Sequence, residues 1–276
     1  MYKRILTIQD ISCVGQCSLT VALPILSACG VETAILPSAV LSTHTAGFTG
    51  FTVRDLADDI PKIEAHWKKE GIDFQAIYTG YLGSAAQIAM VQSIMDNLLT
   101  NDGLRIVDPA MADGGKLYPA FDMEYVNAMK NLIEGADYIL PNITEGAFLT
   151  GMEYKEVYDM DYVKKMLDKL TGLGAKSVII TGVTFAENTT GVMVREGGED
   201  KYYEHKKISE SRHGTGDIYS SAFVGALMND MSAYDAAVIA ADYTVRCLEE
   251  TLKGEPHLYG AKFEIVIPEL IKKLIK

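Results

Sequence analysis

The alternation of short apolar runs with longer amphipathic stretches is the feature that most restricts the fold of this chain. We predict strands at six runs rich in β-branched residues: Ile5–Ile8, Thr33–Leu36, Ala76–Thr79, Leu104–Val107, Tyr138–Leu140 and Ser177–Thr181. We predict helices at four stretches between them: Asp55–Glu70, Ala85–Leu99, Met123–Ile133 and Asp161–Leu170. Strands that alternate with helices form βαβ crossovers, which make the strands parallel and cover both faces of the sheet. The pattern therefore predicts an α/β protein of three αβα layers around a mostly parallel sheet.

The remaining sequence fits into the same unit. No repeat, low-complexity segment or Pro/Gly/Ser-rich linker divides residues 1–276, so we predict a single domain. A hairpin is predicted from Gly191–Arg195 and Lys201–Lys207, with its turn over Glu196–Asp200. From Gly216 to Thr251 the chain is predicted to be mostly helical. We also expect no separate lid domain, because the chain has no room for an inserted β-sheet lid before Phe74.

The charge and composition of the chain restrict its partners. The 276 residues carry a formal net charge of −12, which argues against nucleic acid, because binding to phosphate backbones needs a basic surface. No apolar run approaches the roughly 20 residues of a membrane-spanning helix, so we expect no membrane association and a cytoplasmic protein. Cys13 and Cys17 have no second Cys/His pair at matching spacing, so we expect thiols there and no zinc site.

A glycine-rich turn in the last third of the chain is the sharpest signal for a ligand site. It reads Arg212-His213-Gly214-Thr215-Gly216-Asp217 and precedes the apolar run Ile218–Leu227. The glycines allow a tight turn, Thr215 is expected to cap the helix that follows, and the first N–H groups of that helix bind anions such as phosphate. Asp217 in the same turn could accept a proton from an attacking hydroxyl. Taken alone, the turn could also be an ordinary helix start.

A second motif follows the predicted strand Tyr138–Leu140. Asn142-Ile143-Thr144-Glu145 places an amide and a carboxylate at the end of that strand. In open α/β sheets ligands bind beyond the carboxyl ends of the strands, and Mg²⁺ takes one or two carboxylates together with waters and phosphates. The alternative is a helix start, capped by Asn142 or Thr144 with Glu145 in the first turn.

These motifs, in this order, resemble those of the ribokinase-like kinases, and in particular of the pyridoxal (vitamin B6) kinases. The resemblance extends to five further segments: Asp10-Ile11-Ser12, Gly15 with Ser18-Leu19, Leu41–Phe48, Thr79-Gly80-Tyr81 and Val107–Asp113. It covers essentially the whole chain and implies a ribokinase-like fold. It also implies ATP-dependent phosphorylation of the 5′-hydroxymethyl group of pyridoxal, pyridoxamine or pyridoxine, in pyridoxal phosphate salvage. Mg²⁺, a monovalent cation (K⁺ or Na⁺) and a homodimer are further expectations from the resemblance.

The resemblance also implies roles for individual residues. Four would contact the ring of the acceptor: Ser12, His44, Thr45 and Tyr81. Asp217 would deprotonate the hydroxymethyl group, and the transferred phosphoryl group would be held by Gly214, Thr215 and Gly216. Besides that loop, the ATP site would include Asp108, Asp113, Tyr118, Asn142, Glu145 and Thr181. Asp108 and Glu145 would bind Mg²⁺ largely through water, and Ala112–Tyr118 would form a flap over the site.

Several alternatives remain. His213 resembles the hydroxymethylpyrimidine (phosphate) kinases of thiamine synthesis, which share this fold but commonly carry cysteine at the position of Asp217. Leu140 stands where many pyridoxal kinases have threonine, which puts part of the monovalent-cation shell in doubt. A non-catalytic nucleotide- or vitamin-binding protein would not need Asp217. A dehydrogenase would need a glycine fingerprint directly after Ile5–Ile8, and the sequence there does not supply it.

Overall fold

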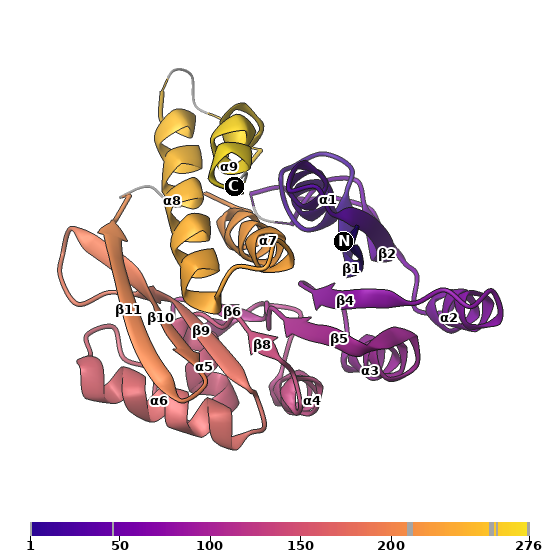
Figure 1. The fold of residues 1–276 in the computed structure, drawn as a ribbon, viewed down its shortest axis with the longest axis horizontal. Helices are drawn as coiled ribbons and strands as arrows, with labels where there is room; N and C mark the ends of the chain where they lie inside the picture. The colour runs from indigo at the N-terminus through magenta and orange to yellow at the C-terminus, as the bar shows by residue number, and fades with distance from the viewer. Residues whose placement is uncertain (1, 46, 209–211, 254–256, 258, 275–276) are drawn as a thin grey trace.

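A nine-stranded sheet organises the molecule (Figure 1). The structure is a computed structural model that describes residues 2–45, 47–208, 212–253, 257 and 259–274. In those residues the strands of this sheet are β1 (Arg4–Ser12), β2 (Glu32–Leu41), β3 (Val53–Asp55), β4 (Phe74–Thr79), β5 (Leu99–Val107), β8 (Tyr138–Ile139), β9 (Ser177–Val183), β10 (Thr189–Glu196) and β11 (Glu199–Lys206). Their spatial order is β11-β10-β9-β8-β5-β4-β1-β2-β3. The strands from β9 to β2 run parallel, whereas β10, β11 and β3 pair antiparallel at the two edges.

Helices cover both faces of this sheet, as Figure 1 shows with the sheet seen nearly edge-on. One face carries α1 (Leu19–Ala28), α7 (Thr215–Met228), α8 (Ala233–Thr251) and α9 (Ile267–Leu274), which follows the short 3-10 turn η1 (Glu264–Val266). The other carries α2 (Ile60–Lys69), α3 (Ala85–Leu98), α4 (Met123–Ile133), α5 (Ile143–Thr150) and α6 (Met160–Gly172). The predicted three-layer αβα architecture is confirmed.

Two hydrophobic clusters fill the space between the sheet and its helices. Along β1, Ile5 packs into the cluster with α1, α7 and α8, whereas Leu6 and Ile8 pack into the cluster with α3, α4 and α6. All three side chains are completely buried. Because alternate side chains of a strand point to opposite faces, a strand covered on both faces must be apolar throughout. This is why the central strands were readable as continuous apolar runs.

Several predicted boundaries were wrong. The helix expected from Asp55 begins at Ile60, because Val53–Asp55 instead pairs with the end of β2. The Asp55 carboxylate then accepts a hydrogen bond from the Ala57 N–H at 2.7 Å, which turns the chain before the helix. The strand expected to end at Thr181 continues to Val183, where it pairs with β10. The predicted hairpin is confirmed, with a tighter turn than expected.

The parallel strands direct their carboxyl ends to one edge of the sheet. β1 ends at Ser12, β4 at Thr79, and Asp108 follows directly after β5. Asn142 follows β8 and forms an isolated parallel bridge with Thr181 in β9. Helix α7 begins beside α1, with which it packs on the same face of the sheet (Figure 1). In the part of the chain that the structure describes, no helix is both long and apolar enough to cross a membrane.

Candidate active site

The glycine turn before α7 forms an open helix N-terminus. The N-cap is Gly214, in the left-handed conformation at φ 77°, and no side chain caps the helix. The expected capping role of Thr215 is therefore wrong, since its hydroxyl donates to the Arg212 carbonyl at 2.6 Å. A Cβ at Gly216 would meet no atom within 4 Å, so this turn borders open space. Its first N–H groups are thus available to an anion, with the positive end of the helix dipole behind them.

Asp217 lies in the first turn of α7 and is half-buried. The backbone of Ser18 donates a hydrogen bond to its carboxylate, which favours the ionised form. Burial outweighs that hydrogen bond and, with smaller effects of the charges of Asp108 and Asp10, raises the pKa of Asp217 from 3.8 to about 7. A carboxylate with a pKa near neutrality can accept a proton from a hydroxyl and release it to solvent.

Asp10 and Ser18 are site residues that the sequence analysis did not assign. The buried carboxylate of Asp10 accepts hydrogen bonds from the Ser18 hydroxyl at 2.6 Å and from the Ser12 hydroxyl at 3.3 Å. Burial raises the pKa of Asp10, and the two serine hydroxyls oppose that effect. Ser18 itself has a positive φ of 53°, which is uncommon outside glycine. That conformation lets its side chain hold Asp10 while its backbone holds Asp217.

The residues expected around the acceptor ring differ in their surroundings. His44 is buried, and within the described residues neither of its ring nitrogens has a hydrogen-bond partner. Its ring meets Phe48 edge-on at 4.9 Å and lies 5.5 Å from His213 between centroids. Burial, and then His213, lower the pKa of His44 below 6.5, so it is a neutral donor and acceptor near pH 7. Thr45, in contrast, is exposed.

The two further residues of this set are Tyr81 and Ser12. Tyr81 is half-buried against Phe121, with ring centroids 5.3 Å apart. Burial and the charge of Asp10 raise the pKa of Tyr81, so its hydroxyl stays protonated near neutrality. Ser12 is almost completely buried, and its hydroxyl proton is directed to Asp10. Ser12 can therefore offer a ligand only its oxygen lone pairs.

Two further carboxylates, Asp108 after β5 and Glu145 in α5, are buried. Asp108 accepts a hydrogen bond from the Ser220 hydroxyl at 2.6 Å, and burial raises the pKa of Asp108 to about 6. Glu145 accepts backbone N–H bonds from Met111 at 3.1 Å and Asn142 at 2.8 Å. Burial, and then the charge of Asp108, raise the pKa of Glu145 well above its usual value.

A divalent cation suits this pair of carboxylates. The charge of Asp108 raises the pKa of Glu145, and a nearby positive charge would stabilise the ionised forms of both buried carboxylates. Among the described residues, no group of three or more His, Cys, Asp or Glu could hold a metal ion. Asp108 and Glu145 supply two carboxylates, and Mg²⁺ needs only one or two when water and phosphate oxygens complete its shell.

Asn142 and Glu145 also form the capping box that the sequence allowed. The Asn142 amide oxygen accepts the Glu145 N–H at 2.9 Å, and the Glu145 carboxylate accepts the Asn142 N–H. The Asn142 amide group in turn donates to the Ala112 carbonyl at 2.9 Å. The motif thus fixes the start of α5 and ties it to the segment expected to form a flap.

The flap segment Ala112–Tyr118 is a short hairpin of β6 (Ala112–Asp113) and β7 (Lys116–Leu117). Its turn glycine Gly115 donates to the Thr144 hydroxyl at 3.1 Å. Asp113 is exposed, and its carboxylate accepts the N–H of the next residue at 2.8 Å, as in a turn. Tyr118 follows β7, and burial together with the charges of Glu145 and Asp108 raises the pKa of its hydroxyl.

A shallow hollow elsewhere does not compete with this site. It has a volume of about 400 Å³ and lies at the start of α8, lined by Asp230, Met231, Ser232, Asp235, Val238 and Ile239. The 14-residue helix α7 separates it from Asp217, a distance of about 20 Å at 1.5 Å per residue. None of the buried carboxylates described above lines it.

Comparisons with known proteins show which family the chain resembles. The sequence model of the phosphomethylpyrimidine kinase family matches residues 23–260. The chain is 30% identical to a pyridoxal kinase of Dictyostelium discoideum over 82% of this chain and 78% of the relative. It is also 30% identical to a hydroxymethylpyrimidine/phosphomethylpyrimidine kinase of Bacillus subtilis, over 78% of each chain. A Bacteroides thetaiotaomicron structure, named provisionally as a phosphomethylpyrimidine kinase and crystallised with pyridoxal, is 37% identical. It covers 98% of this chain and 96% of its own, with a TM-score of 0.92.

Proposed function

Because the chain belongs to the phosphomethylpyrimidine kinase family and to the pyridoxal kinase-like members of the ribokinase-like superfamily, it is an ATP-dependent kinase, and we propose that its acceptor is a B6 vitamer. The reaction would convert pyridoxal, pyridoxamine or pyridoxine into its 5′-phosphate in pyridoxal phosphate salvage. The observation that carries the proposed phosphoryl transfer is Asp217, a carboxylate with a pKa of about 7 in the first turn of an open helix N-terminus. The choice of a B6 vitamer as acceptor is supported by the similarity to a Bacteroides protein crystallised with pyridoxal.

The proposed transfer is in line. The 5′-hydroxyl oxygen forms a bond to the γ-phosphorus of ATP while the bond to the β,γ-bridging oxygen breaks and ADP leaves. The hydroxyl proton moves to the Asp217 carboxylate, which later releases it to solvent. The N–H groups from Gly214 to Gly216 stabilise the charge on the transferred phosphoryl group. Mg²⁺ at Asp108 and Glu145 would supply positive charge beside the phosphates.

The acceptor side supports an aromatic alcohol. His44 and Phe48 offer an edge-on aromatic wall, and the unpartnered nitrogens of His44 offer a donor and an acceptor to polar ring substituents. Ser12 would accept a hydrogen bond, and Tyr81 would border the ring from the side of Phe121. The Bacteroides protein, crystallised with pyridoxal, supports a B6 vitamer as the acceptor.

We extend the proposal to the remaining expected contacts. Thr45 would reach the ring from the exposed end of its loop, and Asp113, Tyr118, Asn142 and Thr181 would line the ATP site. A monovalent cation, a homodimer, a single domain over residues 1–276 and a cytoplasmic location also remain proposals. The one continuous sheet supports the single domain.

Hydroxymethylpyrimidine phosphorylation is the second candidate. The family description and the Bacillus subtilis relative favour it, and so does His213, which lies beside His44 and could serve a pyrimidine. The chemistry at Asp217 would be unchanged, because this acceptor also presents a primary alcohol on a small aromatic ring.

The experiment is ADP release from Mg·ATP, with pyridoxal, pyridoxamine, pyridoxine and hydroxymethylpyrimidine supplied separately. Turnover of a B6 vitamer that disappears in Asp217→Ala, while ATP still binds, is the expected result. Turnover of the pyrimidine alone would move the protein to the second candidate. Near wild-type turnover by Asp217→Ala would overturn the assignment of the base.

A further inference from the structure

A short turn between β1 and α1 packs against the proposed phosphate-binding loop Gly214–Gly216. The backbone carbonyl of Gln16 lies against Gly214 so closely that a Cβ on Gly214 would overlap it. Two residues later, the backbone of Ser18 donates to the Asp217 carboxylate. The turn that contains Gln16 and Ser18 therefore contacts both the N-cap of α7 and the proposed base.

Gln16 is held from outside the site by the segment 259–266, which we name the C-terminal strap. The Gln16 N–H donates to the Tyr259 carbonyl at 2.6 Å, and its side-chain amide donates to the Glu264 carboxylate at 2.7 Å. A Cβ at Gly260, where φ is 127°, would come within 2.7 Å of the Gln16 Cβ. Backbone and side chain of Gln16 are thus both fixed by the strap, almost 250 residues further along the chain.

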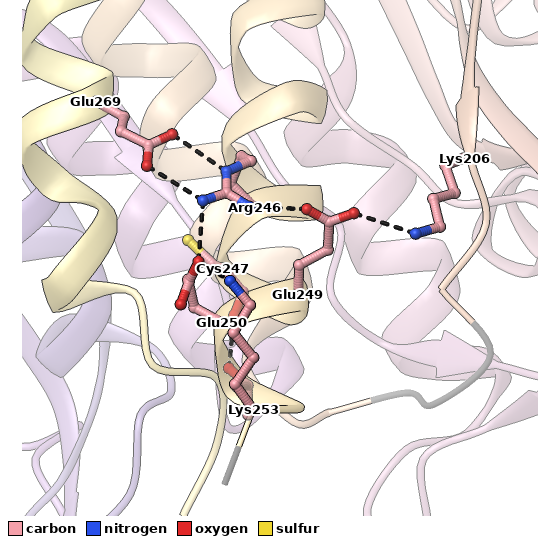
Figure 2. Close-up of polar contacts among 8 residues, drawn as sticks. Lys206, Arg246, Cys247, Glu249, Glu250, Lys253 and Glu269 are labelled. Carbon is pink, nitrogen blue, oxygen red and sulfur yellow. Dashed lines mark hydrogen bonds and ion pairs between the residues drawn. The ribbon is translucent and has the colours of Figure 1, made fainter.

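The strap is itself anchored in the core. Ala261 and Phe263 are buried, and the Phe263 carbonyl accepts the Tyr243 hydroxyl of α8 at 3.0 Å. Beyond the strap, α9 is tied to α8 by Arg246, which contacts Glu269 as well as Glu249 and Glu250 (Figure 2). Gln16 therefore links two segments. The C-terminal strap, which is anchored in the core, contacts it on one side, and the phosphate-binding loop contacts it on the other.

We propose that Gln16 is a positioning residue for phosphoryl transfer, which holds the Gly214–Gly216 loop in its anion-binding geometry through its contacts with Tyr259 and Glu264. The inference rests on the proposed function, because it needs the phosphoryl group to be bound by that loop. A small shift of such a loop mainly weakens binding of the transition state, since the charge that the N–H groups stabilise develops there. The strap touches the loop through Gln16 and so acts on turnover without contacting the reacting atoms.

The test exchanges the donor and the acceptor of the side-chain hydrogen bond between Gln16 and Glu264. Gln16→Glu is isosteric but places a carboxylate opposite Glu264, so the strap and the turn should separate. We expect kcat to fall about tenfold, the equivalent of one hydrogen bond to a charged group, with the KM for the acceptor nearly unchanged. Glu264→Gln keeps an acceptor for the Gln16 amide and should stay near wild type. The double variant Gln16→Glu/Glu264→Gln restores the bond with reversed polarity and should recover kcat.

A matched control separates positioning from simple stabilisation. Glu269→Gln removes the ion pair with Arg246 that Figure 2 shows. Among the described residues the hydrogen bonds of Gln16 go to Tyr259 and Glu264, so this change loosens the same C-terminal region without removing them. It should lower Tm and leave kcat unchanged. The proposal is overturned if Gln16→Glu retains wild-type kcat, if the double variant does not recover it, or if Glu269→Gln lowers kcat equally.

Failure of the proposed function is recognised separately. Amide hydrogen exchange of residues 214–216 in the ligand-free protein needs no substrate. It should be faster in Gln16→Glu than in wild type and be restored in the double variant. Wild-type inactivity with all four acceptors would refute the proposed function, whereas unchanged exchange in Gln16→Glu would refute the role of Gln16.

Discussion

Replacing Asp217 by asparagine should make the protein inactive and more stable at the same time. The structure raises the pKa of Asp217 from 3.8 to about 7, chiefly by burial. Between these values the folded protein holds a proton that the unfolded chain has lost, so stability falls as the pH rises through this window and then stays constant. Asparagine has nearly the same shape and carries no charge, so the stability of the variant should not fall as the pH rises through this window.

The magnitude follows from the two pKa values. A difference of about three units corresponds to about 4 kcal/mol at pH 8 and to about 2 kcal/mol at pH 5.5. Since Asp217 is only half-buried and asparagine accepts the Ser18 N–H less strongly, we expect a gain of about 2–4 kcal/mol at pH 8. The loss of a general base should lower kcat by about 10²–10⁴-fold.

Urea unfolding of wild type and Asp217→Asn at pH 8 and pH 5.5, with ADP release measured on the same samples, checks both effects. Asp58→Asn is the control, because Asp58 is exposed and its replacement should change stability by less than about 0.5 kcal/mol. A variant no more stable than wild type at pH 8, or a gain independent of pH, would refute the reasoning about the buried carboxylate. Retained activity would refute the role of Asp217 as base.

Three further predictions concern the same site. The kcat/KM for the acceptor should rise about tenfold per pH unit below 7 and level off above it, because the base must be ionised; a flat profile between pH 5.5 and 8 would contradict the pKa of Asp217. Glu145→Gln should raise the Mg²⁺ concentration needed for half-maximal activity by about tenfold, since one carboxylate is lost from the site, and an unchanged Mg²⁺ titration would argue against this role. Gly214→Ala should reduce kcat by at least about 100-fold with an unchanged far-UV circular dichroism spectrum. Alanine is strained in the left-handed conformation of residue 214, and its Cβ would overlap the Gln16 carbonyl. Near-normal turnover would show that the loop tolerates displacement.

The fold was predictable where local pattern and tertiary structure agree. The buried parallel strands are continuous apolar runs, and the helices Met123–Ile133 and Ala85–Leu98 carry clear amphipathic periodicity. The edge strand Val53–Asp55 was missed because its three residues are all exposed and its conformation comes from pairing with β2. Such an element leaves no periodic signal in the sequence.

The local structure of the candidate site was predictable, but its long-range contacts were not. The glycine turn and the capping box are local, so the helix starts at Gly214 and Asn142 could be predicted from residue type and spacing. The hydrogen bond between Ser18 and Asp10 depends on a serine at positive φ, a conformation that residue type does not reveal. The contact between Gln16 and Glu264 joins opposite ends of the chain and exists only after folding.

The most direct test of the account is identification of the product formed from Mg·ATP and pyridoxal. The account predicts that pyridoxal 5′-phosphate accumulates in equal amounts with ADP, as followed by ³¹P NMR and mass spectrometry, and that Asp217→Asn forms neither. Formation of ADP without pyridoxal 5′-phosphate, or phosphate transfer to hydroxymethylpyrimidine alone, would contradict the proposed acceptor.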